Sequence, residues 1–275
     1  MTSTARGPSS VDPVPSSPAF RVEGGRRTTG SSGHAAPALT IITVAFKARE
    51  ALRKSIERVL ALQRDDVAYI VIDGNSNDGT VELLRSHDEQ LEYWISEPDS
   101  GIYNAMNKAV RLAAPGSYVL FLGAGDLILR LPEPETISGA IAAGSELLYG
   151  DVLIGKRLFR STFSKKLKYR NTLHHQGLFV QMGSPQEKWF DESFKVFSDW
   201  NLNLQLFTRG ASAQRLDYTI AYAEPDGVSA KLHIPEIARL VARQCGLLHA
   251  LMAVLYHGGL HYARFYAGLL PSSRK

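Results

Sequence analysis

Three aspartates stand where their carboxylates could hold a polar ligand. Asp73, Asp99 and Asp126 each follow an apolar run, and each lies close to glycine or proline. In an open α/β sheet the carboxyl ends of parallel strands meet at one edge, and ligands bind in the crevice there. Carboxylates delivered to such an edge predict a pocket for something polar and metal-bound.

Each aspartate also has a simpler structural explanation. Asp73 opens an Asp-Gly turn, Asp78 stands where a helix N-cap is needed, and Asp99 can cap the helix that follows it. The turn 123–126 has the sequence Gly-Ala-Gly-Asp, which is also typical of a tight turn after a buried strand. Its small residues would let the backbone approach a diphosphate, and the carboxylate of Asp126 suits Mg²⁺ or Mn²⁺.

The helix predicted after Asp99 has two faces. Its N-terminus suits an anion, because backbone N–H groups and the positive end of the helix dipole meet there. Asn104 and Lys108 would flank the same crevice, although a solvated helix face has the same composition. The polar stripe is Asn104, Asn107, Lys108 and Arg111, and the buried stripe is Ile102, Met106, Ala109, Val110 and Ala113.

Alternating strands and helices are predicted to position these side chains. The strands are buried on both faces, since their residues are almost continuously apolar. Short connections between the elements imply right-handed crossovers, so we predict an α/β fold with a mostly parallel sheet flanked by helices. The strands are 39–46, 67–73, 91–96 and 117–122, and the helices are 52–60, 80–84 and 99–113.

The second half of the chain is less regular. Its strands fall outside the alternating pattern, which favours a subregion built on the same sheet. Its predicted elements are a hairpin of 147–154 and 157–163, strands 176–181 and 215–223, a helix from Asp199 and helical segments from Pro235. We divide the chain into a tail (1–37), a domain (38–230) and a C-terminal helical segment (231–275).

Composition restricts the class of protein. The 275 residues are 44% hydrophobic and 21% charged, which allows one sizeable core, and Cys245 cannot form an intrachain disulfide. Residues 1–37 are rich in Ser, Pro and Gly, so we expect disorder there. Neither a signal peptide nor a membrane span is expected, and the basic residues are not interleaved with aromatics as in nucleic-acid-binding modules.

The C-terminal segment combines apolar residues with cations. On one continuous helix the cations and histidines would share a side, which suits a helix lying in a membrane interface. The glycines 246 and 258–259 would instead give short helices that pack on the domain or on a second subunit. We favour peripheral membrane contact. The residues on that side are Arg239, Arg243, His257, His261 and Arg264.

Two stretches carry a resemblance to a known family. Residues 70–80 read Ile-Val-Ile-Asp-Gly-Asn-Ser-Asn-Asp-Gly-Thr, and residues 93–108 contain Ser-Glu-Pro-Asp-Ser-Gly-Ile-Tyr-Asn-Ala-Met-Asn-Lys. Together with the rest of 39–229 they resemble the family 2 glycosyltransferases of the GT-A fold, particularly bacterial enzymes that build surface polysaccharides.

The resemblance implies inverting, metal-dependent transfer of a sugar from a nucleotide-sugar donor, by default linked to UDP. The acceptor would be a glycan or a lipid-linked molecule. The metal would be Mg²⁺ or Mn²⁺, and the enzyme would work in the cytoplasm or on the inner face of the cytoplasmic membrane.

The resemblance also implies roles for individual residues. Asp73 would contact the nucleotide base with Thr43 nearby, Asp99 would lie at the donor site, and Asp151 near the donor sugar. Asp126 would match the last carboxylate of the family's DXD motif. The chain departs from that motif, because Ala124 and Gly125 precede Asp126. Metal affinity without donor should therefore be weak.

Asp199 matches the position of the catalytic base in the family. It would remove the proton from the acceptor hydroxyl as that oxygen attacks the anomeric carbon. Without the resemblance, simple N-capping of the following helix would explain Asp199 equally well.

The motif His174-His175-Gln176 also attracts attention. Adjacent histidines on a strand point to opposite faces, so they would not share one metal ion. His175 or Gln176 would line the sugar or acceptor pocket, or serve as structural polar residues. His233 could reach the metal from a loop, but a surface position is the simpler interpretation.

Two other functions remain open. A sugar-phosphate nucleotidyltransferase needs a similar sheet and metal, but residues 46–50 lack the glycine-rich phosphate loop expected after the first strand. A catalytically degenerate donor-binding scaffold would fit the reduced metal motif.

Overall fold

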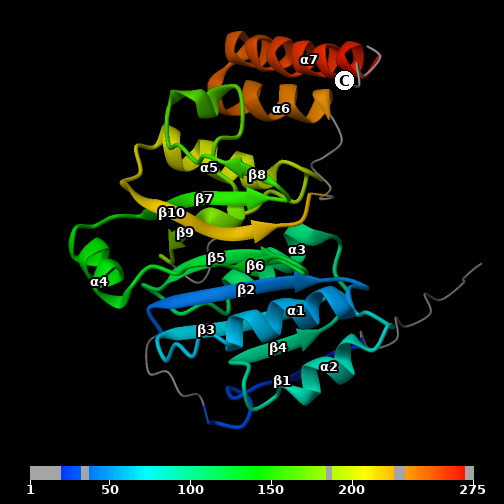
Figure 1. Ribbon diagram of the computed structural model, residues 1–275, viewed down its shortest axis with the longest axis vertical. Helices are drawn as coiled ribbons and strands as arrows, with labels where there is room; N and C mark the ends of the chain where they lie inside the picture. Colours follow the sequence, from blue (N-terminus) through cyan, green and yellow to red (C-terminus); the bar gives the residue numbers. More distant parts are fainter. Residues whose placement is uncertain (1–19, 32–36, 184–187, 226–232, 270–275) are drawn as a thin grey trace, which may run out of the picture.

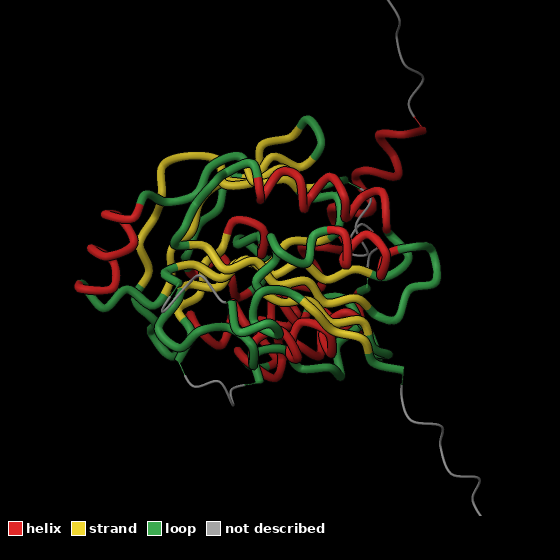
Figure 2. Tube along the Cα trace, turned by 90° about the horizontal axis from the view of Figure 1, so that it is seen from below, coloured by secondary structure: helices red, strands yellow, loops and turns green. Residues whose placement is uncertain are grey.

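The computed structural model describes residues 20–31, 37–183, 188–225 and 233–269, with side chains up to residue 259. These described residues form a 10-stranded sheet in the order β1-β4-β3-β2-β5-β9-β7-β10-β6, with β8 paired to β7. Helices cover both faces of the sheet (Figures 1 and 2). The predicted α/β fold class is confirmed.

The first half of the chain builds the regular part of the sheet. Strands β4, β3, β2 and β5 pair in parallel, and Ala45 lies opposite Asp73, which lies opposite Ser96. Their carboxyl ends are therefore level at one edge. The elements are β2 (Leu39–Ala45), α1 (Arg49–Leu60), β3 (Val67–Asp73), α2 (Thr80–Ser86), β4 (Tyr93–Ser96), α3 (Ile102–Val110) and β5 (Tyr118–Gly123).

Alternation along the strands divides the core into two layers. Ile41 and Ala45 belong to the layer under α1 and α2, whereas Ile42 and Val44 belong to the layer shared with α3 and α5. All seven residues of β2 and of β3 are buried, as expected for strands covered on both faces. Each large apolar side chain buried in this way contributes roughly 1.5–3 kcal/mol relative to an exposed one.

The second half extends the same sheet, as predicted. Strand β9 lies antiparallel between β5 and β7 and so joins the two halves. The elements are β6 (Leu127–Ile128), α4 (Pro134–Ala142), β7 (Leu147–Ile154), β8 (Arg157–Phe159), η1 (Lys165–Lys168), η2 (His175–Gly177), β9 (Leu178–Gln181), α5 (Ser198–Thr208), β10 (Ala213–Ala223), α6 (Ile234–Cys245) and α7 (Leu247–Leu269).

The prediction of disorder throughout 1–37 is wrong for residues 20–31. Strand β1 (Val22–Gly24) pairs antiparallel with β4 at the edge of the sheet. Backbone pairing and the bond that Gly25 N donates to Asp88 Oδ1 (2.7 Å) hold this segment despite its few apolar side chains. Residues 1–19 and 32–36 lie outside the described part of the chain.

Two details of the predicted helices are also wrong. Ile102 is 45% exposed, because α3 begins there and presents Tyr103 to the core instead. Asn107, assigned to the polar stripe, is buried and exchanges hydrogen bonds with the backbone of Phe190. Gly246 (φ +86°) does separate α6 from α7, but the glycines at 258–259 lie inside α7.

The C-terminal helices form the outermost layer beyond α5 (Figure 1). Ile237, Leu240 and Val241 of α6 are buried in the core layer that includes α5. None of the described helices is long and apolar enough to cross a lipid bilayer.

Candidate active site

Asp73 lies at the carboxyl edge of the sheet, but its carboxylate is fully buried. It accepts hydrogen bonds from Ser76 N (2.9 Å) and Ser76 Oγ (2.5 Å), and from Ser96 Oγ (2.6 Å). The side chain therefore fixes the loop after β3 against the end of β4.

Asp99 lies directly beside that loop. A Cβ atom added to Gly74 would lie 2.6 Å from Asp99 Oδ2 and 3.2 Å from Phe46 Cδ2. Asp99 Oδ1 also accepts a hydrogen bond from Gly101 N (2.9 Å), so it stabilises the entry to α3. The structure thus brings the loops after β2, β3 and β4 together.

Phe46 is a further candidate that the sequence pattern did not predict. Its ring is 61% exposed at the end of β2, and Lys47 Nζ lies 5.2 Å from its centroid. Lys47 has positive φ (+50°) and donates its backbone N–H to Ser76 Oγ (2.7 Å), which fixes this turn next to the Asp73 loop. The sequence feature that could have identified Phe46 is an aromatic residue directly after a buried strand.

Asp126 is held by contacts from three directions. Its Oδ2 accepts hydrogen bonds from Gly123 N and Gln176 Nε2, both at 2.7 Å, and its Oδ1 accepts a longer one from Glu224 N (3.3 Å). Burial raises the pKa of Asp126, an effect that the hydrogen bond from Gln176 opposes. Ser55 of α1 supports the turn by donating to Asp126 O and accepting from Gly125 N.

The η2 turn contains the His-His-Gln motif. Because Gln176 donates its amide to Asp126, its Oε1 is left to accept a very short hydrogen bond from His174 Nδ1. Burial, together with the neighbouring His175, lowers the pKa of His174 to about 4, so His174 is neutral at pH 7 and carries its proton on Nδ1.

The prediction that the two histidines point to opposite faces is wrong. It assumed a strand, but these residues enter a 3₁₀ turn. The two rings stack with centroids 5.3 Å apart and planes at 21°.

Asp199 lies in the first turn of α5. Its Oδ2 accepts a hydrogen bond from Asn171 Nδ2 (3.2 Å) and lies 3.6 Å from His175 Nδ1. Asn203 Nδ2 donates to Asn171 Oδ1 (3.0 Å), which orients the Asn171 amide. The N-cap of α5 is Phe197, without a side-chain capping bond, so the carboxylate of Asp199 is not used for capping.

The donor and base candidates therefore meet at η2. Gln176 contacts Asp126, and the preceding residue, His175, lies beside Asp199. Sequence spacing could not show this contact, because 50 residues separate Asp126 from Gln176.

Two further candidates, Thr43 and Asp151, have structural partners. Thr43 is fully buried within β2, where its hydroxyl pairs with Tyr69 OH (2.9 Å), so the structure does not bring it to the edge. Asp151 is paired with Arg215 Nη2 (2.9 Å) and accepts a hydrogen bond from Ser161 N (3.0 Å).

The two predicted residues of α3 also have partners. Lys108 Nζ pairs with Glu97 Oε1 and donates to Pro98 O, each at 2.8 Å. Asn104 Nδ2 donates to Glu192 Oε2 (3.1 Å). Both lie on the helix that starts beside Asp99. His233 contacts the ring of Phe197 at the start of α6.

A divalent cation would find only part of its ligands here. Among the described residues, no three His, Cys, Asp or Glu side chains cluster closely enough to form a metal site of their own. Asp126 fits a cation that takes its other ligands from phosphate and water, as Mg²⁺ does. Its Oδ1, with one long hydrogen bond, has the spare capacity for that bond.

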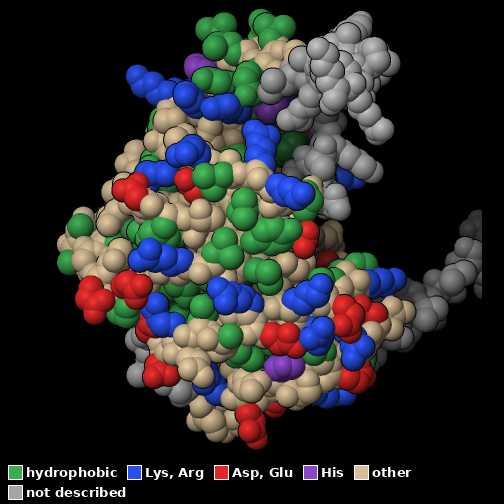
Figure 3. Space-filling model, in the orientation of Figure 1, with side chains coloured by type: hydrophobic (Ala, Val, Ile, Leu, Met, Phe, Trp, Pro, Cys, Tyr) green, Lys and Arg blue, Asp and Glu red, His purple; other side chains and the backbone are tan. Residues whose placement is uncertain are grey.

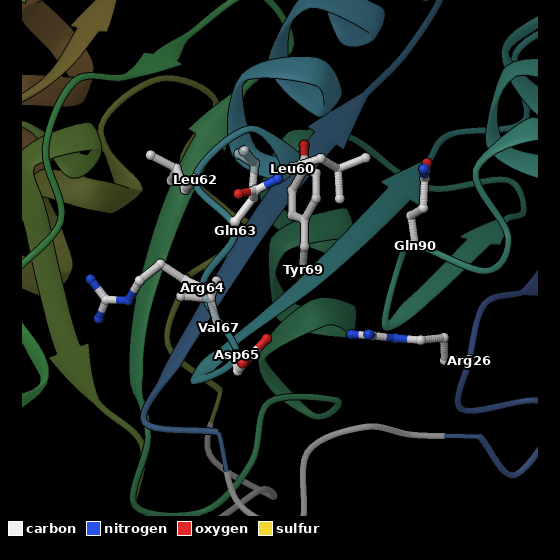
Figure 4. A pocket seen from close by; sticks show the side chains of 10 residues that line it. Arg26, Leu60, Leu62, Gln63, Arg64, Asp65, Val67, Tyr69 and Gln90 are labelled. Carbon is white, nitrogen blue, oxygen red and sulfur yellow. The ribbon is translucent and has the colours of Figure 1, made fainter.

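A separate pocket of about 140 Å³ lies at the opposite edge of the sheet (Figure 4). Val67 at the start of β3 and Leu60 at the end of α1 line it, together with Arg26, Arg64 and Gln90. It contains none of the predicted site residues.

Comparison with known proteins gives the context for this geometry. Residues 40–130 match the family model described as glycosyl transferase family 2. A protein of Mycobacterium tuberculosis named "PGL/p-HBAD biosynthesis glycosyltransferase" is 28% identical over 213 residues, covering 71% of this chain and 80% of the relative.

Solved structures share the fold. Staphylococcus aureus TarS (1–349) in complex with UDP aligns with a TM-score of 0.60 at 14% identity, over 82% of this chain and 72% of that one. The mannosyltransferase PcManGT from Pyrobaculum calidifontis, in complex with GDP-Man and Mn²⁺, aligns with a TM-score of 0.50 at 17% identity, over 87% and 83%.

Proposed function

Because the chain carries a family 2 glycosyltransferase domain in a GT-A fold, we propose that it transfers a sugar from a nucleotide-sugar donor to an acceptor hydroxyl with inversion. The observation that carries the mechanism is the η2 turn. His175 lies beside Asp199, and the next residue, Gln176, donates a hydrogen bond to Asp126. One turn therefore holds both the proposed base, Asp199, and the carboxylate proposed to face the diphosphate, Asp126.

The donor's nucleoside binds at the ends of β2, β3 and β4. The exposed ring of Phe46 offers a stacking surface for a base, beside Gly74 and Asp99. Asp73 holds the loop that forms this surface. The absence of a side chain at Gly74 keeps the space between Asp99 and Phe46 open. The UDP in the TarS complex supports a uridine donor.

The diphosphate extends from there toward Asp126. Lys108 and Asn104 of α3 exchange their partners Glu97 and Glu192 for donor oxygens when the donor binds. A cation bound by Asp126 and the diphosphate would supply charge stabilisation for the leaving group. The Mn²⁺ in the PcManGT complex supports such an ion.

The chemical step is a single displacement. Asp199 accepts the proton of the acceptor hydroxyl while that oxygen forms its bond to the anomeric carbon. The bond from that carbon to the diphosphate oxygen breaks, and its electron pair leaves with the nucleoside diphosphate. Asn171 keeps the Asp199 carboxylate oriented, and an α-linked donor gives a β-linked product.

The acceptor is a glycan or a lipid-linked glycan precursor. The name of the mycobacterial relative, which refers to PGL/p-HBAD biosynthesis, supports an acceptor from cell-envelope biosynthesis. Arg170 directly precedes Asn171, which contacts Asp199, and would offer a cation to an anionic acceptor.

Two aspartate variants test the proposal. Asp199→Asn should bind UDP as tightly as the wild type, by calorimetry with Mn²⁺, but lose transfer by about 10²–10⁴-fold. Asp126→Asn should weaken both donor binding and transfer. The control is Asp65→Asn, an exposed aspartate at the opposite edge of the sheet.

Full transfer activity in folded Asp199→Asn would refute the assignment of the base. If the wild type binds the donor but transfers the sugar to none of the acceptors tested, a donor-binding scaffold becomes the better explanation.

A further inference from the structure

Charge is distributed unevenly along the chain. Residues 152–186 and 237–275 together contain 12 Lys or Arg and no Asp or Glu. The rest of the chain therefore has 19 basic and 27 acidic residues, although the whole chain has a net charge of only +4. A basic surface on an otherwise acidic protein favours an anionic partner for that surface alone.

The described part of α7 exposes an apolar face. Its five large apolar side chains there are between 47% and 81% exposed, and they recur at the spacing of one helix face. Ala250 and Ala253 on the other side are buried against the domain. The exposed residues, which we call the α7 face, are Leu247, Leu248, Leu251, Met252 and Leu255.

The basic segment around η1 lies next to α7. Arg170 Nη1 donates to Tyr256 OH (2.9 Å), and the rings of Tyr169 and Tyr256 are 5.8 Å apart. Burial raises the pKa of the Cys245 thiol at the end of α6, and the charge of Lys168 partly opposes this shift. Lys165 and Lys166 are exposed on the same turn.

The surface view shows the two features together. Hydrophobic side chains lie at the outer end of the molecule over α7, and Lys and Arg side chains lie directly beneath them (Figure 3). A leucine-rich helix face beside a row of cations is the composition of a surface that lies in the headgroup region of a bilayer.

The sequence-based prediction chose a different side of the C-terminal segment. Arg239 donates to Ser193 O (2.7 Å), and Arg243 pairs with Asp191 (2.6 Å), so both guanidinium groups contact the loop 191–193, although both residues are exposed. His257 lies against Trp200, with ring centroids 5.8 Å apart. These three residues therefore contact the domain, and the side chains of the other two residues in that prediction, His261 and Arg264, lie outside the described part of the chain.

We propose that the α7 face and the lysines of η1 dock on the surface of an anionic lipid bilayer. The leucines enter the boundary between headgroups and acyl chains, and Lys165, Lys166 and Lys168 contact lipid phosphates. A second copy is a poorer partner, because a symmetric dimer through this surface would bring two acid-free, basic patches together. The proposal does not depend on the transferase activity.

Docking there would place lipid close to the acceptor side of the site. Trp200 directly follows Asp199 on α5, contacts His257 of α7, and donates its indole N–H to Leu167 O of η1 (2.8 Å). One layer of side chains thus separates the docking surface from the helix that carries the proposed base.

Vesicle sedimentation with the full chain tests the proposal. The wild type should bind phosphatidylcholine vesicles that contain phosphatidylglycerol, and binding should fall at least about tenfold on vesicles without it. Salt at about 1 M, where the Debye length is about 3 Å, should cause a similar loss.

Matched variants separate the apolar contribution of the α7 face from the electrostatic contribution of the lysines of η1. Leu251→Glu/Leu255→Glu should reduce the partition coefficient at least about tenfold, whereas Leu129→Glu/Ile141→Glu, at exposed apolar positions elsewhere, should not. Lys165→Glu/Lys166→Glu should weaken binding to anionic vesicles, whereas Lys54→Glu/Arg85→Glu should have little effect. Circular dichroism verifies that each variant is folded.

Equal binding to neutral and anionic vesicles, or unchanged binding of Leu251→Glu/Leu255→Glu, would overturn the proposal. A dimer in sedimentation equilibrium that this double variant dissociates, without vesicle binding, would assign the α7 face to a second copy. Loss of transfer activity with normal vesicle binding would count against the proposed reaction only.

Discussion

The two halves of the sheet hold their polar side chains in different ways. In the parallel half, Asp73 finds its partners in Ser76, three residues on, and in Ser96 at the end of the neighbouring strand. All the groups involved belong to consecutive β-α-β units. The hydrogen bonds that this carboxylate accepts from Ser76 and Ser96 therefore all come from the parallel half.

In the mixed half, the polar contacts join distant segments. Gln176 donates to Asp126 across 50 residues, and Asn171 donates to Asp199 across 28. These carboxylates take their positions only when β9 and η2 pack between β5 and β7. The comparison indicates that the geometry of the proposed nucleoside site is local, whereas the geometry around the proposed diphosphate and base positions depends on how the two halves meet.

The largest effect is expected from adding a negative charge beside Asp126, where η2 joins the two halves of the sheet. Gln176→Glu would place a second carboxylate within hydrogen-bond distance of Asp126, and two adjacent carboxylates do not both ionise readily. Transfer should fall about 10³-fold, which corresponds to roughly 4 kcal/mol of transition-state stabilisation. Steady-state kinetics with calorimetric donor titration would show the change in kcat and donor affinity.

The control for Gln176→Glu is Gln205→Glu, which adds the same charge at an exposed position of α5. It should retain nearly full activity. Wild-type kinetics in Gln176→Glu would show that the contact between Gln176 and Asp126 has no part in the reaction, and the contrast between the halves would lose its functional meaning.

The next largest effect is expected in how the free energy of unfolding depends on pH. Burial lowers the pKa of His174 to about 4, so between pH 6.5 and 4 the unfolded chain binds a proton there that the folded chain does not. The free energy of unfolding should therefore fall as the pH falls through this range. The contribution of His174 reaches roughly 3 kcal/mol, at 1.36 kcal/mol per pKa unit.

His174→Asn isolates this contribution. The asparagine amide can still donate to Gln176 Oε1 but does not titrate, so the difference between wild type and variant should shrink as the pH falls from 6.5 to 4. Asp126, whose pKa burial raises, acts in the opposite direction, but it is common to both proteins and cancels. Urea unfolding at a series of pH values measures the effect, and parallel curves would contradict it.

The contrast between the halves also explains what could be predicted from the sequence. The parallel strands, the helices between them and the carboxylates at one edge follow from periodicity and short connections. The position of Asp73 needs only neighbouring elements. The sequence also indicated that the later strands join the same sheet.

The errors have a common physical origin in long-range contacts. Asn107 looked solvated, but the backbone of Phe190, 83 residues away, makes its burial possible. Strand β1 forms because the edge of β4 is available for pairing, which its own composition does not reveal. Arg239 and Arg243 lie along the domain surface because the loop 191–193 offers acceptors that no helical periodicity can show.

A smaller effect is expected from steric disruption of the same junction. A Cβ at Gly177 would lie 2.6 Å from Val152 Cγ2 and 2.7 Å from Gly150 O, so β7 would have to move away from η2. Gly177→Ala should cost about 2 kcal/mol of unfolding free energy and reduce transfer. Thermal and urea unfolding measure the first effect, and kinetics the second.

The matched substitution is Gly139→Ala in α4. No atom lies within 4 Å of a Cβ there, so the variant should be more stable by about 0.5–1 kcal/mol, as expected for alanine replacing glycine inside a helix. If both variants changed stability in the same direction by similar amounts, the tight approach of η2 to β7 would not be a constraint.

The smallest effect distinguishes the arginines that pack on the domain from the lysines that face outward. Arg243 pairs with Asp191, but its side chain is more than half exposed, and such pairs contribute at most about 1 kcal/mol. Arg243→Ala should therefore lower the free energy of unfolding by less than that amount, and less still at high salt. It should leave vesicle binding unchanged, because its guanidinium lies against the loop at 191 instead of beside the α7 face. A loss of vesicle binding as large as that of Lys165→Glu/Lys166→Glu would mean that the C-terminal layer turns its arginine side to the membrane, as its sequence pattern alone had suggested.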